Sequence, residues 1–202
     1  MIIGLCGLMG SGKGTAADVL VEDLDFVKMS FADSLKDGVA AMFDFPRNLL
    51  EGDTFESREW REIPDEFWSE EMGVEMTPRK ILQLVGTDCL RENFYGGIWV
   101  SILKKKIIDA SEQGINVVIP DTRFINEIDM IKSIGGDVWH IWRDVPQWAV
   151  DYRKTEIAPE NIHPSEYSWI LSDADISIIN DSTLEKLKSE VFKHVNEHIF
   201  SS

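Results

Sequence analysis

A glycine-rich run at residues 7–15, GLMGSGKGT, constrains the fold of this 202-residue chain more than any other feature. It follows the continuous apolar run Met1–Cys6, which predicts a buried parallel strand. It opens a segment that predicts a helix over about Lys13–Leu24. Glycines let the backbone wrap closely around phosphate oxygens, and amide N–H groups with a helix N-terminus attract negative charge. The run therefore predicts a phosphate-binding loop between a strand and a helix.

The loop also carries the side chains that a nucleotide needs. Lys13 is the cation expected to reach the β and γ phosphates, and Mg²⁺ usually meets a Ser or Thr hydroxyl directly after that lysine. Here Gly14 follows the lysine and Thr15 comes one residue later, a form that resembles the nucleoside monophosphate kinases. Direct and water-mediated Mg²⁺ contact by Thr15 both stay open. The expected ATP-binding residues are Met9, Gly10, Ser11, Gly12, Lys13, Gly14 and Thr15.

Apolar runs and helical periodicity alternate along the rest of the chain, which predicts a parallel sheet covered on both faces by helices. The fold class is therefore α/β, in three layers, and we expect one domain over residues 1–202. The further strands are expected at Phe26–Phe31, Asn116–Pro120, Val138–Trp142 and Ala174–Ile179. The further helices are expected at Asp33–Phe43 with Asp33 as the N-cap, Gly97–Gln113, Asn126–Ile134 and Thr183–Ile199.

Residues from about 51 to 76 differ in composition from the rest of the chain. They are rich in acidic and aromatic residues, and their basic residues are Arg58 and Arg61. We interpret them as a partly helical insertion that covers the active site or forms a homodimer contact, and both alternatives stay open. Thr77 and Pro78 then predict the start of a helix whose apolar stripe runs to Leu90.

Charge and hydropathy exclude several classes of function. The net charge of −16 argues against nucleic acid as a partner, because phosphate-backbone binding needs a basic surface. No apolar run approaches the roughly 18–20 residues of a membrane span. Cys6 and Cys89 fall at apolar positions, so we expect two buried free thiols and a reducing, cytoplasmic setting.

A second motif, Pro120-Asp121-Thr122-Arg123, follows the strand expected at Asn116–Pro120. Ligands of open α/β sheets bind at the carboxyl ends of the strands, so Asp121 is expected near the glycine-rich loop. Its carboxylate is a candidate ligand of Mg²⁺ or of a water on Mg²⁺, and Arg123 is a candidate phosphate-binding cation. A helix cap and a surface arginine are the simpler alternatives for these two residues.

Together these residues resemble the bacteriophage deoxynucleoside monophosphate kinases, a branch of the P-loop kinase superfamily. The resemblance extends over nearly the whole chain. It rests on the loop Gly7–Thr15, Leu35-Lys36-Asp37, Arg79 with Leu82-Gln83 and Gly86-Thr87-Asp88, Asn93, Trp99-Val100, Pro120–Arg123 with Glu127, His140-Ile141 with Arg143, and Ser165-Glu166.

The resemblance implies ATP as donor, Mg²⁺ as cofactor and a deoxynucleoside monophosphate as acceptor, with the diphosphate product serving DNA precursor synthesis in the host cytoplasm. It implies a mobile lid over about 144–168. The implied catalytic residues are Lys13, Arg123, Arg143 and Asp121. The implied acceptor-binding residues are Lys36, Arg79, Gln83, Asp88, Trp99, Arg123 and Glu166, and the implied metal contacts are Thr15 and Asp121.

Further alternatives stay open for Trp99 and for the function as a whole. Trp99 is one of seven tryptophans and fits core packing as well as a base pocket. A P-loop kinase for dephospho-coenzyme A or phosphomevalonate would share the loop, and Asp33 could then serve as a base for a hydroxyl acceptor. A nucleotide-binding switch without transfer activity would leave the additional arginines unexplained.

Overall fold

Five parallel strands form one sheet within residues 1–201, the part of the chain that the computed structural model describes, with side chains to residue 197. The strand order is β2-β3-β1-β4-β5, so β1 lies at the centre between β3 and β4. The strands are β1 (Ile2–Cys6), β2 (Phe26–Lys28), β3 (Asn116–Ile119), β4 (Asp137–Trp142) and β5 (Ile176–Ile179). In the register, Gly4 lies opposite both Ile119 of β3 and Val138 of β4. The predicted parallel sheet is confirmed.

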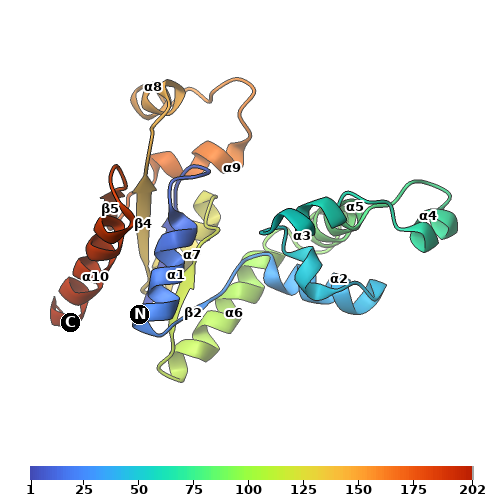
Figure 1. The fold of residues 1–202 in the computed structure, drawn as a ribbon, viewed down its shortest axis with the longest axis horizontal. Coiled ribbons are helices and arrows are strands. Elements are labelled where there is room, and N and C mark those ends of the chain that lie inside the picture. The colour runs from blue at the N-terminus through green and yellow to red at the C-terminus, as the bar shows by residue number, and fades with distance from the viewer. Residues whose placement is uncertain (202) are drawn as a thin grey trace. The chain divides into compact units, whose positions relative to one another are not determined.

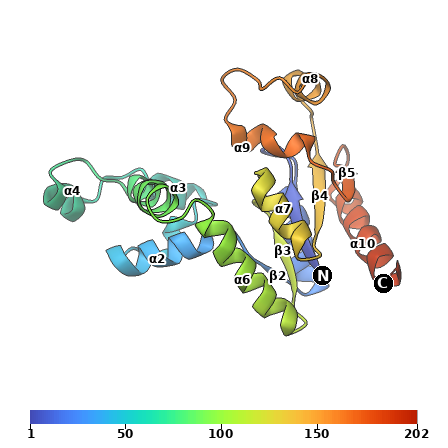
Figure 2. The same cartoon turned by 180° about the vertical axis from the view of Figure 1, so that it is seen from behind.

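Helices cover both faces of this sheet, as Figures 1 and 2 show from opposite sides. On one face, α1 (Lys13–Leu24) and α10 (Leu184–Ser201) share a core with Ile3 and Leu5 of β1. On the other face lies α7 (Ile125–Ser133), and its Ile131 packs so closely on Gly4 that a Cβ there would collide with it. Alternate residues of β1 therefore face opposite helical layers, as a buried central strand requires.

The chain divides into two compact units, each with its own core. One comprises Met1–Ser30 and the chain from Leu103 onward, and the other comprises Phe31–Ile102. The insertion expected at about 51–76 lies inside the second unit. The expectation of one domain over 1–202 stays a prediction.

The second unit is helical in the residues that the structure describes. Its elements are α2 (Asp33–Phe43), η1 (Arg47–Leu50), α3 (Phe55–Trp60), α4 (Glu66–Met72), α5 (Pro78–Gln83) and η2 (Leu84–Glu92), followed by the start of α6 (Ile98–Glu112). Aromatic packing ties the insertion to the core of this unit, because Trp60 meets Phe45 and Trp68 meets Phe43 at ring-centroid distances of 5.5 and 4.9 Å. The partly helical character expected for the insertion is confirmed.

The helix that begins at Pro78, with Thr77 as its N-cap, changes its hydrogen-bonding pattern part-way. The Thr77 side chain accepts from the Lys80 amide and Pro78 occupies the first helical position, as predicted. From Leu84 the helix becomes a π-helix, in which each N–H bonds five residues back and the angular period differs from 3.6 residues. Cys89 thereby leaves the predicted apolar stripe. The expectation of a buried thiol at Cys89 is wrong, because this cysteine is exposed, whereas Cys6 is buried as expected.

Some helices and strands begin or end at other residues than predicted. α1 and α2 have the predicted bounds, but Asp33 is the first helical residue of α2 and the N-cap is Ala32, so the N-cap prediction for Asp33 is wrong. As a carboxylate in the first turn, Asp33 still favours the helix through its dipole. β2 ends at Lys28, three residues before the predicted Phe31, because pairing with β3 stops there.

The segment after β4, expected to form a lid over about 144–168, contains two short helices in the first unit. They are α8 (Gln147–Thr155) and α9 (Pro164–Tyr167), and the 3-10 turn η3 (Ser168–Leu171) follows them. Tyr152 and Tyr167 pack edge to face at 4.9 Å, which links the two helices.

Among residues 1–201, no helix combines the length and apolarity that a membrane crossing requires.

Candidate active site

The glycine-rich loop joins β1 to α1 in the geometry that its sequence predicts. Gly10 and Gly12 have φ values of 77° and 101°, in the left-handed region that side chains other than glycine's rarely adopt. Gly12 is also the N-cap of α1, and a Cβ on it would collide with the amide of Asn180. The two glycines thus allow the loop to turn tightly into the helix N-terminus.

The Lys13 side chain folds back onto the backbone of this loop. Its Nζ donates to the carbonyl oxygens of Gly7 at 2.6 Å and of Leu8 at 2.8 Å. Burial, with a smaller contribution from the positive charge of Arg123, lowers the pKa of Lys13 to about 8, although Glu166 opposes this shift. This ammonium is partly desolvated and donates hydrogen bonds to backbone carbonyls. It can therefore exchange these partners for a stronger acceptor such as a phosphate oxygen.

Asn180, which sequence reasoning missed, binds the loop through a hydrogen bond to its backbone. It directly follows β5, is 7% exposed, and its Nδ2 donates to the Ser11 carbonyl at 2.9 Å. Its own amide N–H donates to Trp142 O at 2.7 Å, which fixes Asn180 to the end of β4. The rule that ligands bind at the carboxyl ends of parallel strands is the signal that could have identified this residue.

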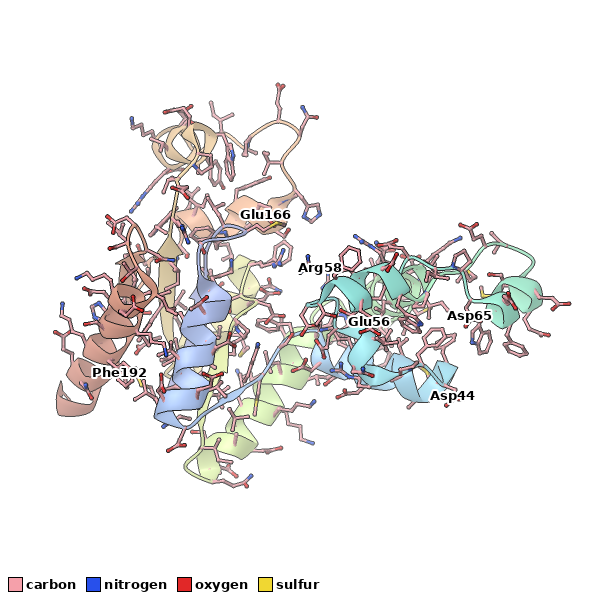
Figure 3. All side chains as sticks on the ribbon, in the orientation of Figure 1. Asp44, Glu56, Arg58, Asp65, Glu166 and Phe192 are labelled. Carbon is pink, nitrogen blue, oxygen red and sulfur yellow. The ribbon has the colours of Figure 1, made fainter. Side chains whose placement is uncertain are left out.

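A cavity of about 530 Å³ opens above the loop within the first unit. Lys13, Arg123 and Arg143 line it, and among the carboxylates of the described residues Glu166 alone reaches its wall. Figure 3 shows Glu166 at α9, and its carboxylate meets the Arg123 guanidinium at 3.3 Å. The remaining lining residues are Gly7, Met9, Gly10, Ser11, Gly12, Gly14, Thr15, Pro120, Ser165, Asn180, Ser182, Leu184 and Leu187. The volume is typical of small-molecule sites, and the three cations favour an anionic ligand.

A buried carboxylate positions the backbone of Arg123. Glu127 is 7% exposed, and one of its oxygens accepts from the amides of Arg123 at 2.7 Å and of Phe124 at 3.1 Å. These bonds cap the start of α7 and fix the chain where it leaves β3. The guanidinium of Arg123 itself is about half exposed and lies on the cavity wall.

The two expected metal contacts offer oxygen ligands but no complete protein cage. Asp121 follows β3 and accepts a hydrogen bond from Ser30 Oγ at 2.6 Å, while Thr15 lines the cavity. The described residues contain no group of three or more His, Cys, Asp or Glu side chains able to hold a metal ion. Mg²⁺ in phosphoryl-transfer sites keeps several waters and substrate oxygens and needs few protein oxygens. A hydroxyl and a carboxylate of this kind fit that requirement.

Arg143, expected at the base of the lid, directly follows β4. It reaches the cavity wall and is about half exposed. Its Nε lies 3.5 Å from the carboxylate of Asp144, which is 93% exposed and therefore holds the arginine only weakly. Arg143 is thus able to exchange this partner for a phosphate.

In the second unit, Lys36 lies in a network of charges around Glu51. The Lys36 ammonium meets Glu51 at 2.5 Å, and Arg47 bonds to Glu51 and, at 2.6 Å, to Asp37. Burial alone would raise the pKa of Glu51, but the hydrogen bonds from Lys36 and Arg47 outweigh it and lower that pKa. Glu51, the first residue of the insertion, thus anchors it to α2.

The other residues expected to bind the acceptor also lie in the second unit. Arg79 pairs with Glu62 at 2.6 Å, with both side chains about half exposed, and Gln83 and Asp88 are exposed. Trp99 is 7% exposed, and its indole N–H donates to the Gly86 carbonyl at 3.0 Å in the π-helix. This bond gives Trp99 a packing role inside the unit, and its role toward a base stays a prediction.

Comparisons with known proteins identify the family of this chain. The family model for deoxynucleotide monophosphate kinase matches residues 48–191. A protein of Acanthamoeba polyphaga mimivirus, provisionally named a deoxynucleotide monophosphate kinase, is 34% identical over 97% of this chain and 96% of its own length. The chain belongs to the deoxynucleotide monophosphate kinase family. The predicted family is thereby confirmed, and the chain is a phosphotransferase that acts as a deoxynucleoside monophosphate kinase.

A shorter sequence match and a solved structure add to this comparison. The deoxynucleotide monophosphate kinase of Enterobacteria phage T4 is 28% identical over 56% of this chain, but the match covers only 43% of the phage protein. Among solved structures, dephospho-CoA kinase from Campylobacter jejuni matches 97% of this chain and 96% of its own with a TM-score of 0.52. At 17% identity, that likeness concerns the fold alone.

Proposed function

We propose that this member of the family transfers the γ-phosphoryl group of ATP, as its Mg²⁺ complex, to a deoxynucleoside 5′-monophosphate and releases ADP with the deoxynucleoside diphosphate. The observation that carries the proposal is the cavity above the loop, in which Lys13, Arg123 and Arg143 meet. Both substrates are intracellular nucleotides, so we place the reaction in the host cytoplasm. The expected homodimer stays a prediction.

The donor side of the reaction falls to the first unit. The loop amides and the N-terminus of α1 would bind the β and γ phosphates, and Lys13 would exchange its two backbone carbonyls for phosphate oxygens. Arg123 and Arg143 would neutralise charge on the transferring group. Thr15 and Asp121 would hold Mg²⁺ directly or through water, and the ion would draw charge from the phosphate oxygens.

For the acceptor, the residues that we propose in the second unit are Lys36 and Arg79, and those in the first unit are Arg123 and Glu166. Lys36 and Arg79 already pair with the carboxylates of Glu51 and Glu62, which supports a role for both cations toward an anion. Gln83, Asp88 and Trp99 would shape the pocket for sugar and base. Glu166, which already accepts a hydrogen bond from Arg123, would orient that guanidinium toward a phosphate in the cavity of the first unit.

The chemistry requires positioning more than proton transfer. A monophosphate ester is mostly a dianion at neutral pH, because its second pKa is about 6. One of its oxygens would bond to the γ phosphorus while the bond from that phosphorus to the β–γ bridging oxygen breaks, so that ADP leaves with the electron pair. No general base is required, and the site supplies cations and, by the proposed closure of residues 144–168, protection from water.

Release of ADP tests the proposal, with each deoxy- and ribonucleoside monophosphate as acceptor and a reaction without acceptor as control. Stimulation by one or more deoxynucleotides is the expected result. Lys13→Ala should abolish turnover while the far-ultraviolet circular dichroism spectrum stays that of the unaltered protein. Lys105→Ala, which removes an exposed lysine of α6, is the matched control and should keep full activity. Turnover that survives Lys13→Ala would refute the assignment.

A further inference from the structure

Arg61 has an unusual position among the arginines of the second unit. It is the C-cap of α3, and Figure 3 labels Arg58 and Glu56 on that same helix. Its guanidinium lies so close to Gly52 that a Cβ at that position would overlap it. Gly52 has a φ of 71°, so this turn both favours glycine and leaves room for the guanidinium.

The guanidinium of Arg61 forms few hydrogen bonds for its degree of burial. It carries five N–H donors. Within the described residues its one hydrogen bond runs from Nη1 to the Leu50 carbonyl at 3.5 Å, the outer limit of such a bond. Nε is buried and has no partner in this part of the chain. A half-buried cation with unused donors is costly unless an anion completes the site.

Two other arginines of this unit, unlike Arg61, use their N–H donors in hydrogen bonds and ion pairs within the unit. Arg58 donates from Nε to Gly52 O at 3.1 Å and from Nη2 to Asp53 O at 2.7 Å. Arg47 reaches three carboxylates, those of Asp33, Asp37 and Glu51. These two side chains serve the unit's own structure, whereas Arg61 retains donors that its own unit does not use.

Arg79 lies beside Arg61. The Arg79 amide donates to the Arg61 carbonyl at 3.1 Å, which ties the first turn of α5 to the end of α3. Burial first, and then the positive charge of Arg79, lowers the pKa of Arg61. The Arg79–Glu62 pair is about half exposed on both sides, and exposed pairs of this kind contribute little to stability. Glu62 is thus a partner that a doubly charged ligand can replace.

We infer that Arg61 and Arg79 form an anion-binding subsite of the second unit, and that its ligand is the 5′-phosphate of the nucleotide acceptor. The inference rests on the proposed function and adds Arg61 to the acceptor-binding residues. A phosphate dianion accepts bidentate hydrogen bonds from guanidinium groups. It would satisfy the donors of Arg61 and offset the repulsion between the two arginines.

Steady-state kinetics of Arg61→Gln test the subsite. At saturating MgATP, the KM for the deoxynucleoside monophosphate should rise at least about tenfold, because hydrogen bonds to charged groups contribute that much or more. The KM for ATP should stay unchanged, which distinguishes the acceptor phosphate from the phosphates of the donor. Arg91→Gln, which removes an exposed arginine of η2, is the matched control and should leave both constants unchanged.

Inorganic phosphate provides a measurement that a purely structural role would not affect. With the loop occupied by MgATP, phosphate should inhibit competitively against the acceptor, and Arg61→Gln should raise its inhibition constant in proportion to the KM. Arg61→Lys, which keeps the charge but loses the bidentate geometry, should lie between the two proteins and serves if the glutamine variant fails to fold. An acceptor KM and phosphate inhibition constant within twofold of the unaltered protein in the folded variants would overturn the subsite, and so would equal increases in both KM values. Lack of activity in the unaltered protein would instead remove the proposed function.

Discussion

Asn180→Ala removes the side chain that holds the phosphate-binding loop to the end of β5. The variant loses one buried hydrogen bond, and the Ser11 carbonyl is left without its Nδ2 donor in a buried site. Leaving a buried acceptor unsatisfied costs about 1–3 kcal/mol. At about 2–4 °C per kcal/mol for a protein of this size, the Tm should fall by about 2–12 °C.

Asn180→Asp separates the loss of the hydrogen bond from the effect of a negative charge at this position. A carboxylate has the same shape but cannot donate to Ser11 O, and it places a negative charge on the wall of the cavity that would hold the triphosphate. Asn180→Asp should lose at least as much stability as Asn180→Ala, because its buried carboxylate would face the Ser11 carbonyl oxygen. The KM for ATP should rise at least about tenfold more in Asn180→Asp than in Asn180→Ala, which corresponds to about 1.4 kcal/mol.

Thermal unfolding by circular dichroism and initial rates at varied ATP measure the two effects. Asn126→Ala, which changes an exposed residue of α7, is the control for loss of an asparagine. An unchanged Tm in Asn180→Ala would show that the bond to Ser11 O contributes nothing to the loop. Equal KM values for the two Asn180 variants would show that the cavity does not receive the phosphates.

Three further predictions concern other parts of the site. Burial and Arg123 lower the pKa of Lys13 to about 8, so ATP affinity should weaken as the pH rises from about 7 to about 9 and the ammonium loses its proton; constant affinity in calorimetric titrations would contradict this. Glu127→Gln should lower the free energy of unfolding by about 1 kcal/mol, seen as a lower urea midpoint, and raise the acceptor KM by misplacing Arg123; an unaltered midpoint would contradict the capping role. Trp99→Phe should destabilise the protein by about 1–3 kcal/mol because the Gly86 carbonyl loses its indole donor, and a wild-type unfolding curve would refute this.

The parts of the fold that were predicted from sequence depend on local signals. The bounds of α1 follow from the glycines of the loop, and the start of α5 follows from Thr77 and Pro78. The parallel sheet follows from apolar runs that alternate with helical periodicity. These features need no knowledge of distant residues, so sequence reasoning recovered them.

The parts that were missed depend on distant contacts or on a change of helical period. Asn180 lies 169 residues from Ser11, and no local pattern marks the bond between them. The π-helix at Leu84–Glu92 places Cys89 at the surface. The prediction of a buried thiol failed because it assumed a period of 3.6 residues throughout the helix. The end of β2 depended on where β3 stops pairing with it.

In the reaction proposed for this site, the γ-phosphoryl group moves from ATP to a nucleotide. ATP labelled in its γ-phosphate, incubated with Mg²⁺ and a deoxynucleoside monophosphate, tests this directly when the products are separated by chromatography. We predict that the label appears in the deoxynucleoside diphosphate, that its amount equals the ADP formed, and that Lys13→Ala abolishes both. Label that appears only as inorganic phosphate, with every nucleotide tried, would contradict the claim.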